Sequence, residues 1–196
     1  MSKDRQLDKI LCFVSDEMAD FEITLVIHIL RAIGNREIVT VGYDLAPVVS
    51  QSGFTYLPHR TLAQAIDLPE VEALIIPGGP IRSQRDELTK LILKIHNEKK
   101  LLAAICFGPQ YLGRAGILNH HRYTTSCSED TIQSLQVDDP FPRHNYVEKR
   151  VVRDEHVITA KGGAFVDFAF AIFDYLHIYS GMNDEKEGFY HEIVGG

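Results

Sequence analysis

The chain has no apolar run long enough to cross a bilayer as a helix, so its sequence excludes a membrane-spanning protein. The first residues, Met1 to Gln6, also lack the apolar core of a secretory signal. We therefore expect a protein that is not exported and that works in the cytoplasm without a membrane partner.

Cysteine is scarce, and Cys12, Cys106 and Cys127 are the only three in the chain. An odd number without regular spacing is not a disulfide framework and suits a reducing compartment. The chain also has no CxxC motif and no histidine–cysteine cluster at the spacing of zinc ligands. The sequence therefore indicates neither a bound metal nor a cofactor.

Basic residues are in the minority, with 20 lysines and arginines against 27 aspartates and glutamates and a formal net charge of -7. The isoelectric point is near 5.7. This surplus of acid argues against binding to nucleic acid or to an anionic membrane surface. The length of 196 residues and the hydrophobic content of 45% suit one sizeable core. We expect a single domain over residues 1–196.

Short apolar runs alternate with segments of helical periodicity along most of the chain. The expected strands are 10–15, 37–43, 73–76 and 101–105, with hairpins at 48–57 and 146–160. The expected helices are 22–33, 62–66, 86–97, 110–115 and 164–179. This alternation predicts an α/β fold with a mainly parallel central sheet and helices on both faces.

Sites in such folds lie beyond the carboxyl ends of the strands. The loops 16–21, 77–82 and 106–109 follow expected strands, and we expect them to form the site. Residues 128–145 are the least regular stretch and predict a surface insertion near that site.

One cysteine stands where an expected buried strand meets a tight turn. The run Leu101–Ile105 is continuously apolar, Cys106 follows it directly, and Gly108 allows a sharp change of direction. This pattern predicts a nucleophile elbow with sulfur in place of a serine oxygen. A helix N-terminus beside the thiol would lower its pKa. The alternative from this segment alone is a buried structural cysteine.

Three segments, taken together and in order, resemble the ThiJ/PfpI family of the class I glutamine amidotransferase-like superfamily. They are Ile75–Gly79, Ala103–Pro109 and Val157–Gly163. Members of this family include deglycases and intracellular protease- or amidase-like proteins. The resemblance implies a flavodoxin-like three-layer α/β sandwich and a homodimer.

The resemblance also implies an acid at the start of the first helix, hydrogen-bonded to the elbow thiol. An ungapped comparison puts Glu22 at this position, whereas other registers put Ala19 or Asp20 there. An ionised carboxylate repels a thiolate, and a protonated carboxyl donates a hydrogen bond to it, so the two pKa values would belong to the pair. The alternative is that Glu22 only complements the dipole of the first helical turn.

Backbone amides near the elbow are candidates for an oxyanion hole. Glycine lets an N–H approach a bound oxygen closely, so Gly78 or Gly79 would act together with the Phe107 N–H. A plain tight turn at Pro77–Pro80 is the alternative.

The chain departs from the family pattern where a histidine is expected. Peptidase-like members have histidine directly after the cysteine, where this chain has Phe107. Deglycase-type members have one in the strand after the elbow helix, where Ser126 takes its place. Three other histidines, His120, His121 and His144, lie on nearby loops, and we expect each to be an exposed loop residue.

These features predict a cysteine-dependent enzyme acting on a small carbonyl, glycated adduct or amide, with Cys106 as nucleophile and Glu22 managing the proton. Peptide hydrolysis is least supported, because a leaving amine needs a general acid. One alternative is a sensor of oxidative stress or a chaperone-like dimer, in which Cys106 is reversibly oxidised. Cys127 is a candidate to resolve the oxidised thiol as a disulfide, although we expect it to be an unreactive loop thiol instead. Another is a dimeric binding protein whose site has decayed.

Overall fold

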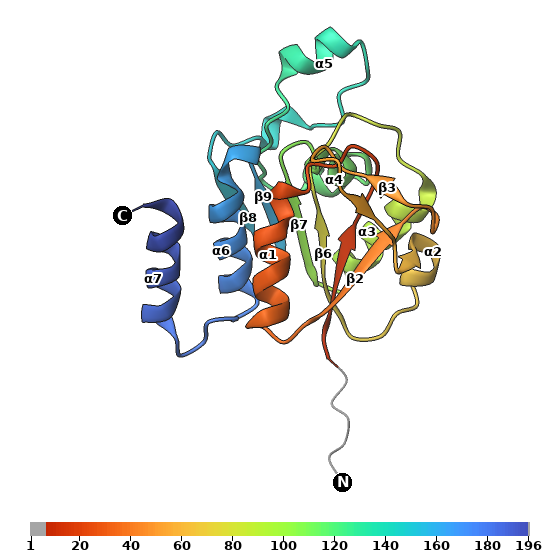
Figure 1. The fold of residues 1–196 in the computed structure, drawn as a ribbon. Helices are drawn as coiled ribbons and strands as arrows, with labels where there is room; N and C mark the ends of the chain where they lie inside the picture. Colours follow the sequence, from red (N-terminus) through yellow and green to blue (C-terminus); the bar gives the residue numbers. More distant parts are fainter. Residues whose placement is uncertain (1–6, 196) are drawn as a thin grey trace.

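The computed structural model describes residues 7–195 and has a seven-stranded sheet at its centre (Figure 1). The strand order is β5-β2-β1-β6-β7-β9-β8. All neighbouring strands run parallel except β8 and β9, which form an antiparallel hairpin at one edge. The strands are β1 (Lys9–Phe13), β2 (Glu37–Gly42), β5 (Arg60–Thr61), β6 (Val71–Ile76), β7 (Leu101–Ile105), β8 (Val151–Asp154) and β9 (Val157–Ala160). A separate hairpin joins β3 (Val48–Val49) to β4 (Thr55–Tyr56).

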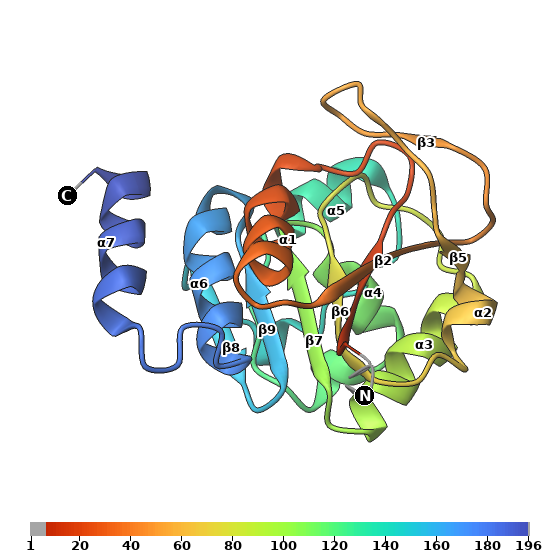
Figure 2. The same ribbon diagram turned by 60° about the horizontal axis from the view of Figure 1, so that its bottom comes forward.

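Helices cover both faces of the sheet, as Figure 2 shows. One face packs against α1 (Phe21–Ala32) and α6 (Phe165–Tyr175), and the other against α2 (Leu62–Ala65), α3 (Asp86–Asn97) and α4 (Pro109–Arg114). A last helix, α7 (Asn183–Val194), lies on the outer side of α6. The predicted three-layer α/β architecture is therefore confirmed.

The central strand β7 shows why the apolar runs form this sheet. Its five side chains are all buried. Leu102 and Ala104 face the core under α3 and α4, whereas Leu101, Ala103 and Ile105 face the core under α1 and α6. A strand covered on both faces needs apolar residues at every position, because successive side chains alternate between the faces.

The structure corrects the sequence prediction at two element ends. The edge strand starts at Val151 rather than at residue 146, and the turn of its hairpin lies at Glu155, which has a φ of 54°. Helix α6 ends at Tyr175 rather than at residue 179, because the chain reverses at His177, also with a φ of 54°.

Two helices lie where the sequence predicted none. Helix α5 (Glu129–Leu135) is inside the stretch expected to be irregular, and the Ser128 side chain caps it by accepting a hydrogen bond from the Thr131 N–H. Helix α7 has no buried residue, so its sequence carries no apolar stripe that periodicity would reveal. Within residues 7–195, no helix combines the length and the apolar character needed to cross a membrane.

Candidate active site

The elbow cysteine lies directly after β7, at the carboxyl edge of the sheet. Cys106 has a φ of 61°, in the left-handed region that side chains rarely adopt. A Cβ on Gly108 would lie 2.7 Å from the carbonyl oxygens of Ile76 and Pro77. The chain therefore folds back so tightly that only glycine fits there, as the sequence predicted.

The side chain of Glu22 reaches the elbow from the first turn of α1. It is 2% exposed, its Oε2 accepts a hydrogen bond from the Gly78 N–H at 2.8 Å, and its carboxyl is hydrogen-bonded to the Cys106 thiol. Asp20, the acid of another register, instead accepts hydrogen bonds from the Ser52 and Tyr56 hydroxyls at 2.7 and 3.0 Å. The structure thus brings Glu22, and not Asp20, to the sulfur.

Two glycines enclose this pair of acids. A Cβ on Gly78 would lie 2.5 Å from Glu22 Oε2 and 3.1 Å from Cys106 Sγ. A Cβ on Gly162 would lie 2.7 Å from Glu22 Oε1 and 3.0 Å from Cys106 Sγ. Gly162 was not among the site residues expected from the sequence, although it is part of the third family-like segment. The pattern that could have identified Gly162 is the pair Gly162–Gly163, which follows the buried strand β9 after one residue.

The backbone amides expected to form an oxyanion hole differ in whether their N–H groups already have a hydrogen-bond acceptor. The Gly78 N–H is already donated to Glu22. Gly79, with a φ of 155°, borders the pocket, and among residues 7–195 its N–H has no hydrogen-bond acceptor. The Phe107 N–H is hydrogen-bonded to the Cys106 sulfur. Among the described residues, Gly79 is therefore the candidate whose N–H is free for a ligand oxygen, and the Phe107 N–H becomes free for one when the sulfur bonds to a substrate.

Ser126 supports the elbow from the far side. Its N–H and the Thr125 hydroxyl both donate to the Cys106 carbonyl oxygen, at 3.0 and 2.6 Å. Its hydroxyl accepts from the Gly162 N–H at 2.8 Å and is hydrogen-bonded to the Cys106 thiol. Since a hydroxyl both accepts and donates, Ser126 can pass polarisation from the Gly162 amide to the sulfur.

The sulfur opens onto a pocket of about 540 Å³ that faces solvent. Besides the residues above, the pocket wall includes Phe21, Gln51 and Pro80. Phe21 is 50% exposed and stands edge-on to Phe165 with ring centroids 5.8 Å apart. An exposed aromatic ring beside the thiol offers a ligand an apolar contact, and the sequence analysis did not identify it.

Within the part of the chain that the structure describes, no histidine borders this pocket. His120 and His144 are exposed, as expected. His121 is not, because it is only 5% exposed and packs against His96 and His156. The expectation that all three are exposed loop histidines is therefore wrong for His121.

The electrostatics of the pair follow from its burial. Burial raises the pKa of the Cys106 thiol to about 12, the Glu22 carboxylate adds to this, and hydrogen bonds from Ser126 and Phe107 act against it. This direction is opposite to the lowering expected from the helix N-terminus. Burial likewise raises the pKa of Glu22. Because the two acids touch, ionisation of one opposes ionisation of the other, so they titrate as a pair.

The other two cysteines have buried side chains. Cys12 and Cys127 are both buried, and burial raises the pKa of the first to about 12 and of the second to about 11. Cys106 borders the pocket described above and has the Glu22 carboxyl beside its thiol, whereas Cys127 borders a different pocket and has Arg143 as its hydrogen-bonding neighbour.

The model of the DJ-1/PfpI family matches residues 8–175. The chain belongs to the DJ-1/PfpI family. This is the family that the sequence motifs indicated under the name ThiJ/PfpI. The chain is 27% identical over 195 residues to a protein named uncharacterized protease YdeA from Bacillus subtilis, with 94% of each chain covered.

Two further relatives of this DJ-1/PfpI protein carry enzyme names. It is 28% identical to a deglycase of Pyrococcus abyssi, over 60% of its own length and 71% of the relative's. It is 27% identical to an isonitrile hydratase of Pseudomonas putida, over 80% of its own length and 66% of the relative's. A solved DJ-1 superfamily protein of Agrobacterium tumefaciens superposes with a TM-score of 0.79 at 25% identity, over 95% and 98% of the two chains.

Replacing Ser126 by alanine is expected to raise the pKa of Cys106. The variant loses a donor to the thiolate, and one pKa unit means a tenfold lower thiolate fraction at any pH below the pKa. Alkylation of Cys106, followed by peptide mass spectrometry from pH 6 to 10, should therefore be about tenfold slower. Ser126→Thr keeps the hydroxyl and serves as the control. Equal rates for Ser126→Ala and the wild type would contradict the assigned hydrogen bond.

Replacing Gly162 by alanine is expected to push Glu22 away from Cys106, because the new methyl group would overlap both side chains. We expect a loss of about 1–3 kcal/mol in the free energy of unfolding, measured in urea. Gly163→Ala is the matched control, since no atom lies within 4 Å of a Cβ at that position. If both variants lose the same free energy of unfolding, close packing around Cys106 and Glu22 is not the cause of the loss.

Proposed function

We propose that this DJ-1/PfpI protein is an enzyme in which Cys106 attacks the electrophilic carbon of a small carbonyl compound, glycated adduct or amide. The observation that carries the proposal is the contact between the Cys106 thiol and Glu22 at the wall of an open pocket. A nucleophile in hydrogen-bond reach of a group that takes its proton is the usual arrangement of covalent catalysis.

The proton has a short route in this mechanism. Glu22 takes the proton of the Cys106 thiol as the sulfur forms a bond to the substrate carbon. The π electrons of the C=O bond move onto its oxygen, and with a carbonyl substrate Glu22 then returns the proton to that oxygen. With an amide, Glu22 returns the proton to the nitrogen instead, while the C=O bond re-forms and the C–N bond breaks, and solvent water then hydrolyses the thioester on Cys106. Because burial raises the pKa of Glu22, its carboxyl is a better proton carrier near neutral pH than an exposed glutamate.

The amides of Gly79 and Phe107 would receive the developing negative charge on oxygen. Fixed backbone donors at such a position need no reorganisation during the reaction, which is why they stabilise the transition state more than water does. The exposed ring of Phe21 would contact the rest of the substrate. The pocket volume of about 540 Å³ suits a small molecule.

The names of the deglycase and the isonitrile hydratase favour an enzyme of this kind over a pure binding protein. Proteolysis stays the least supported chemistry, although YdeA is named an uncharacterized protease. A peptide leaving group would depend on Glu22 alone for its proton. Family membership also favours the homodimer expected from the sequence.

Substitution of the pair tests the proposal. With small aldehydes, early glycation adducts and simple amides as substrates, Cys106→Ala should abolish turnover. Glu22→Gln keeps the size of the side chain but cannot move a proton, so kcat should fall by roughly 10²–10⁴-fold. The matched control is Glu87→Gln, which alters an exposed glutamate in the first turn of another helix, α3. Full activity of Cys106→Ala on a confirmed substrate would rule the mechanism out.

The alternative is an oxidative sensor without turnover. A thiol that borders an open pocket and touches a carboxyl group is placed for oxidation to sulfinate, which a protonated Glu22 would hold by a hydrogen bond. No turnover on any of the substrates, together with peroxide oxidation confined to Cys106 in intact-mass measurements, would favour this function.

A further inference from the structure

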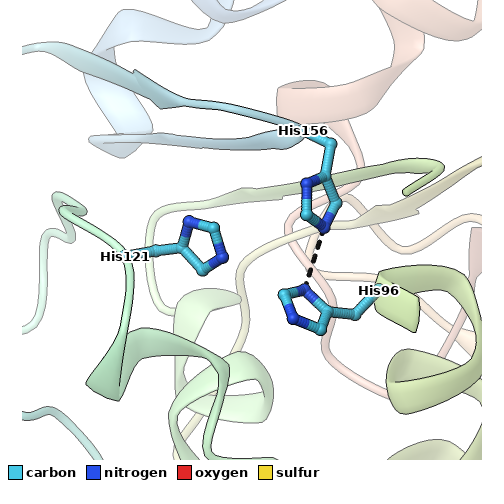
Figure 3. A group of neighbouring side chains, drawn as sticks. All are labelled: His96, His121 and His156. Carbon is cyan, nitrogen blue, oxygen red and sulfur yellow. Dashed lines mark hydrogen bonds between the residues drawn. The ribbon is translucent and has the colours of Figure 1, made fainter. Parts of the chain in front are cut away.

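Three histidines far apart in the sequence lie close together (Figure 3). They lie at the edge of the sheet where β7 and β9 begin, whereas Cys106 follows the other end of β7. His96 lies in the last turn of α3, His121 follows the short 3-10 turn Ile117–Asn119, and His156 lies between β8 and β9. His121 and His156 are 5% and 3% exposed, and His96 is half-buried. One ring nitrogen from each lies within 4.8 Å of the others.

The rings present these nitrogens to one common space. Nε2 of His156 and Nδ1 of His96 face each other at 2.9 Å. Figure 3 shows the ring of His121 turning a nitrogen toward the same pair. The facing nitrogens of His156 and His96 need a proton between them. The His121 nitrogen that faces this pair receives no hydrogen bond from either ring. A cation at the centre would satisfy all three lone pairs at once.

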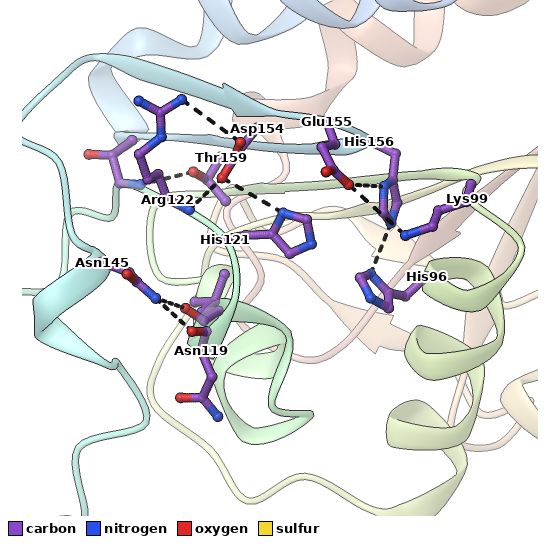
Figure 4. Close-up of polar contacts among 12 residues, drawn as sticks. His96, Lys99, Asn119, His121, Arg122, Asn145, Asp154, Glu155, His156 and Thr159 are labelled. Atoms are coloured by element: carbon purple, nitrogen blue, oxygen red, sulfur yellow. Dashed lines mark hydrogen bonds and ion pairs between the residues drawn. The ribbon is translucent and has the colours of Figure 1, made fainter.

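The outer nitrogens of two rings point at carboxylates (Figure 4). Nδ1 of His121 is 3.8 Å from Asp154, and Nδ1 of His156 is 3.8 Å from Glu155. The Arg122 N–H fixes Asp154 with a hydrogen bond of 2.8 Å. Metal-bound histidines in proteins donate their second N–H to a carboxylate or carbonyl, and these two carboxylates lie near the outer nitrogens but beyond hydrogen-bond distance.

Nδ1 of His121 also stands out as an unsatisfied atom. It is fully buried, and within residues 7–195 it has no hydrogen-bond partner at normal distance. A small rotation of the ring would bring it within reach of Asp154 and turn the opposite nitrogen further into the cluster. Buried polar atoms without partners are uncommon, and a shift of the ring toward Asp154 is the change that would satisfy this one.

The charge state of the rings agrees with this geometry. Burial lowers the pKa of His156 to about 4 and also lowers the pKa of His96, with neighbouring histidines and Lys99 adding to both shifts. Asp154 and Glu155 supply negative charge at the rim, and Lys99 and Arg122 supply positive charge. Burial thus disfavours the protonated form of both rings, and the neutral imidazole is the form that binds a metal.

We propose that His96, His121 and His156 form a binding site for a divalent transition metal of the zinc class, with a water molecule as fourth ligand. Imidazole suits zinc, copper and nickel, whereas magnesium and calcium require oxygen ligands. Zinc–nitrogen bonds of about 2.0–2.1 Å in tetrahedral geometry place the ligand nitrogens about 3.3 Å apart. The nitrogens at 2.9 to 4.8 Å bracket that spacing, so small rotations of the rings suffice.

This site is separate from the candidate active site. The Leu102 N–H donates to the His156 carbonyl at 2.9 Å, at the start of β7, and Cys106 lies four residues further along. At about 3.3 Å per residue the two sites are about 13 Å apart. A bound ion would link α3, the segment after α4 and the β8–β9 hairpin, and would therefore stabilise the fold rather than take part in chemistry at Cys106.

Zinc binding to the full chain tests the proposal. Chain freed of metal with a chelator and then dialysed should bind one Zn²⁺ in calorimetry. At a hundredfold excess over Kd, the ion should raise Tm by about 5–10 °C. His96→Gln should bind at least tenfold more weakly, and because His96 is half-buried this variant should stay folded. Asp154→Asn should weaken binding by about 10–100-fold.

Two variants serve as controls. His120→Gln removes the exposed histidine next to His121 and should bind Zn²⁺ like the wild type. Cys106→Ala excludes the thiol and should also bind normally. Absorption of the Co²⁺-loaded wild type gives a readout that needs no variant, since tetrahedral nitrogen ligation produces intense visible bands. Failure to bind zinc at 100 µM, or equal affinity of His96→Gln and His120→Gln, would overturn the proposal.

Discussion

The contact between the Cys106 thiol and the Glu22 carboxyl is the constraint on which the carboxyl edge of this protein depends. It joins the end of β7 to the start of α1, two elements that lie far apart in the sequence. Both partners would be solvated if the chain around them were any looser. Glycines at 78 and 162 remove the side chains that would separate them, and the Gly78 amide holds the carboxyl in place.

Burial gives this contact its chemical character. A thiol and a carboxyl in water would ionise independently, whereas here burial raises the pKa of both. The protein stabilises the single remaining charge with neutral donors, namely the Ser126 hydroxyl and the amides of Phe107 and Gly78. Neutral donors stabilise an anion without fixing which partner carries it. A histidinium would bias the charge toward the sulfur, and Ser126 stands where the family pattern led us to expect that histidine. Because a serine takes the place of that histidine, we favour proton exchange between Cys106 and Glu22 over the cysteine–histidine proton transfer of a peptidase.

The sequence predicted the architecture well because the sheet is covered on both faces. Continuous apolar runs such as Leu101–Ile105 and the four-residue apolar stripe of α3 leave little choice of structure. It also predicted the elbow, because Gly108 follows Cys106 in a turn that excludes larger residues. Helix α7 escaped prediction because none of its residues is buried. The direction of the thiol pKa was mistaken, because the effect of a helix end is visible in sequence whereas the degree of burial is not.

The histidine cluster shows most directly what a linear sequence hides. Its members are separated by 25 and 35 residues, so no motif of fixed spacing describes them. They meet because parallel strands start at a common edge, where the end of α3 and the β8–β9 turn also lie. The same topology that gathers the loops around Cys106 at one edge must gather other loops at the opposite edge. Whether polar residues collect there depends on which side chains the loops carry. In this chain they carry three imidazoles with carboxylates behind two of them, an arrangement that apolar packing alone does not require.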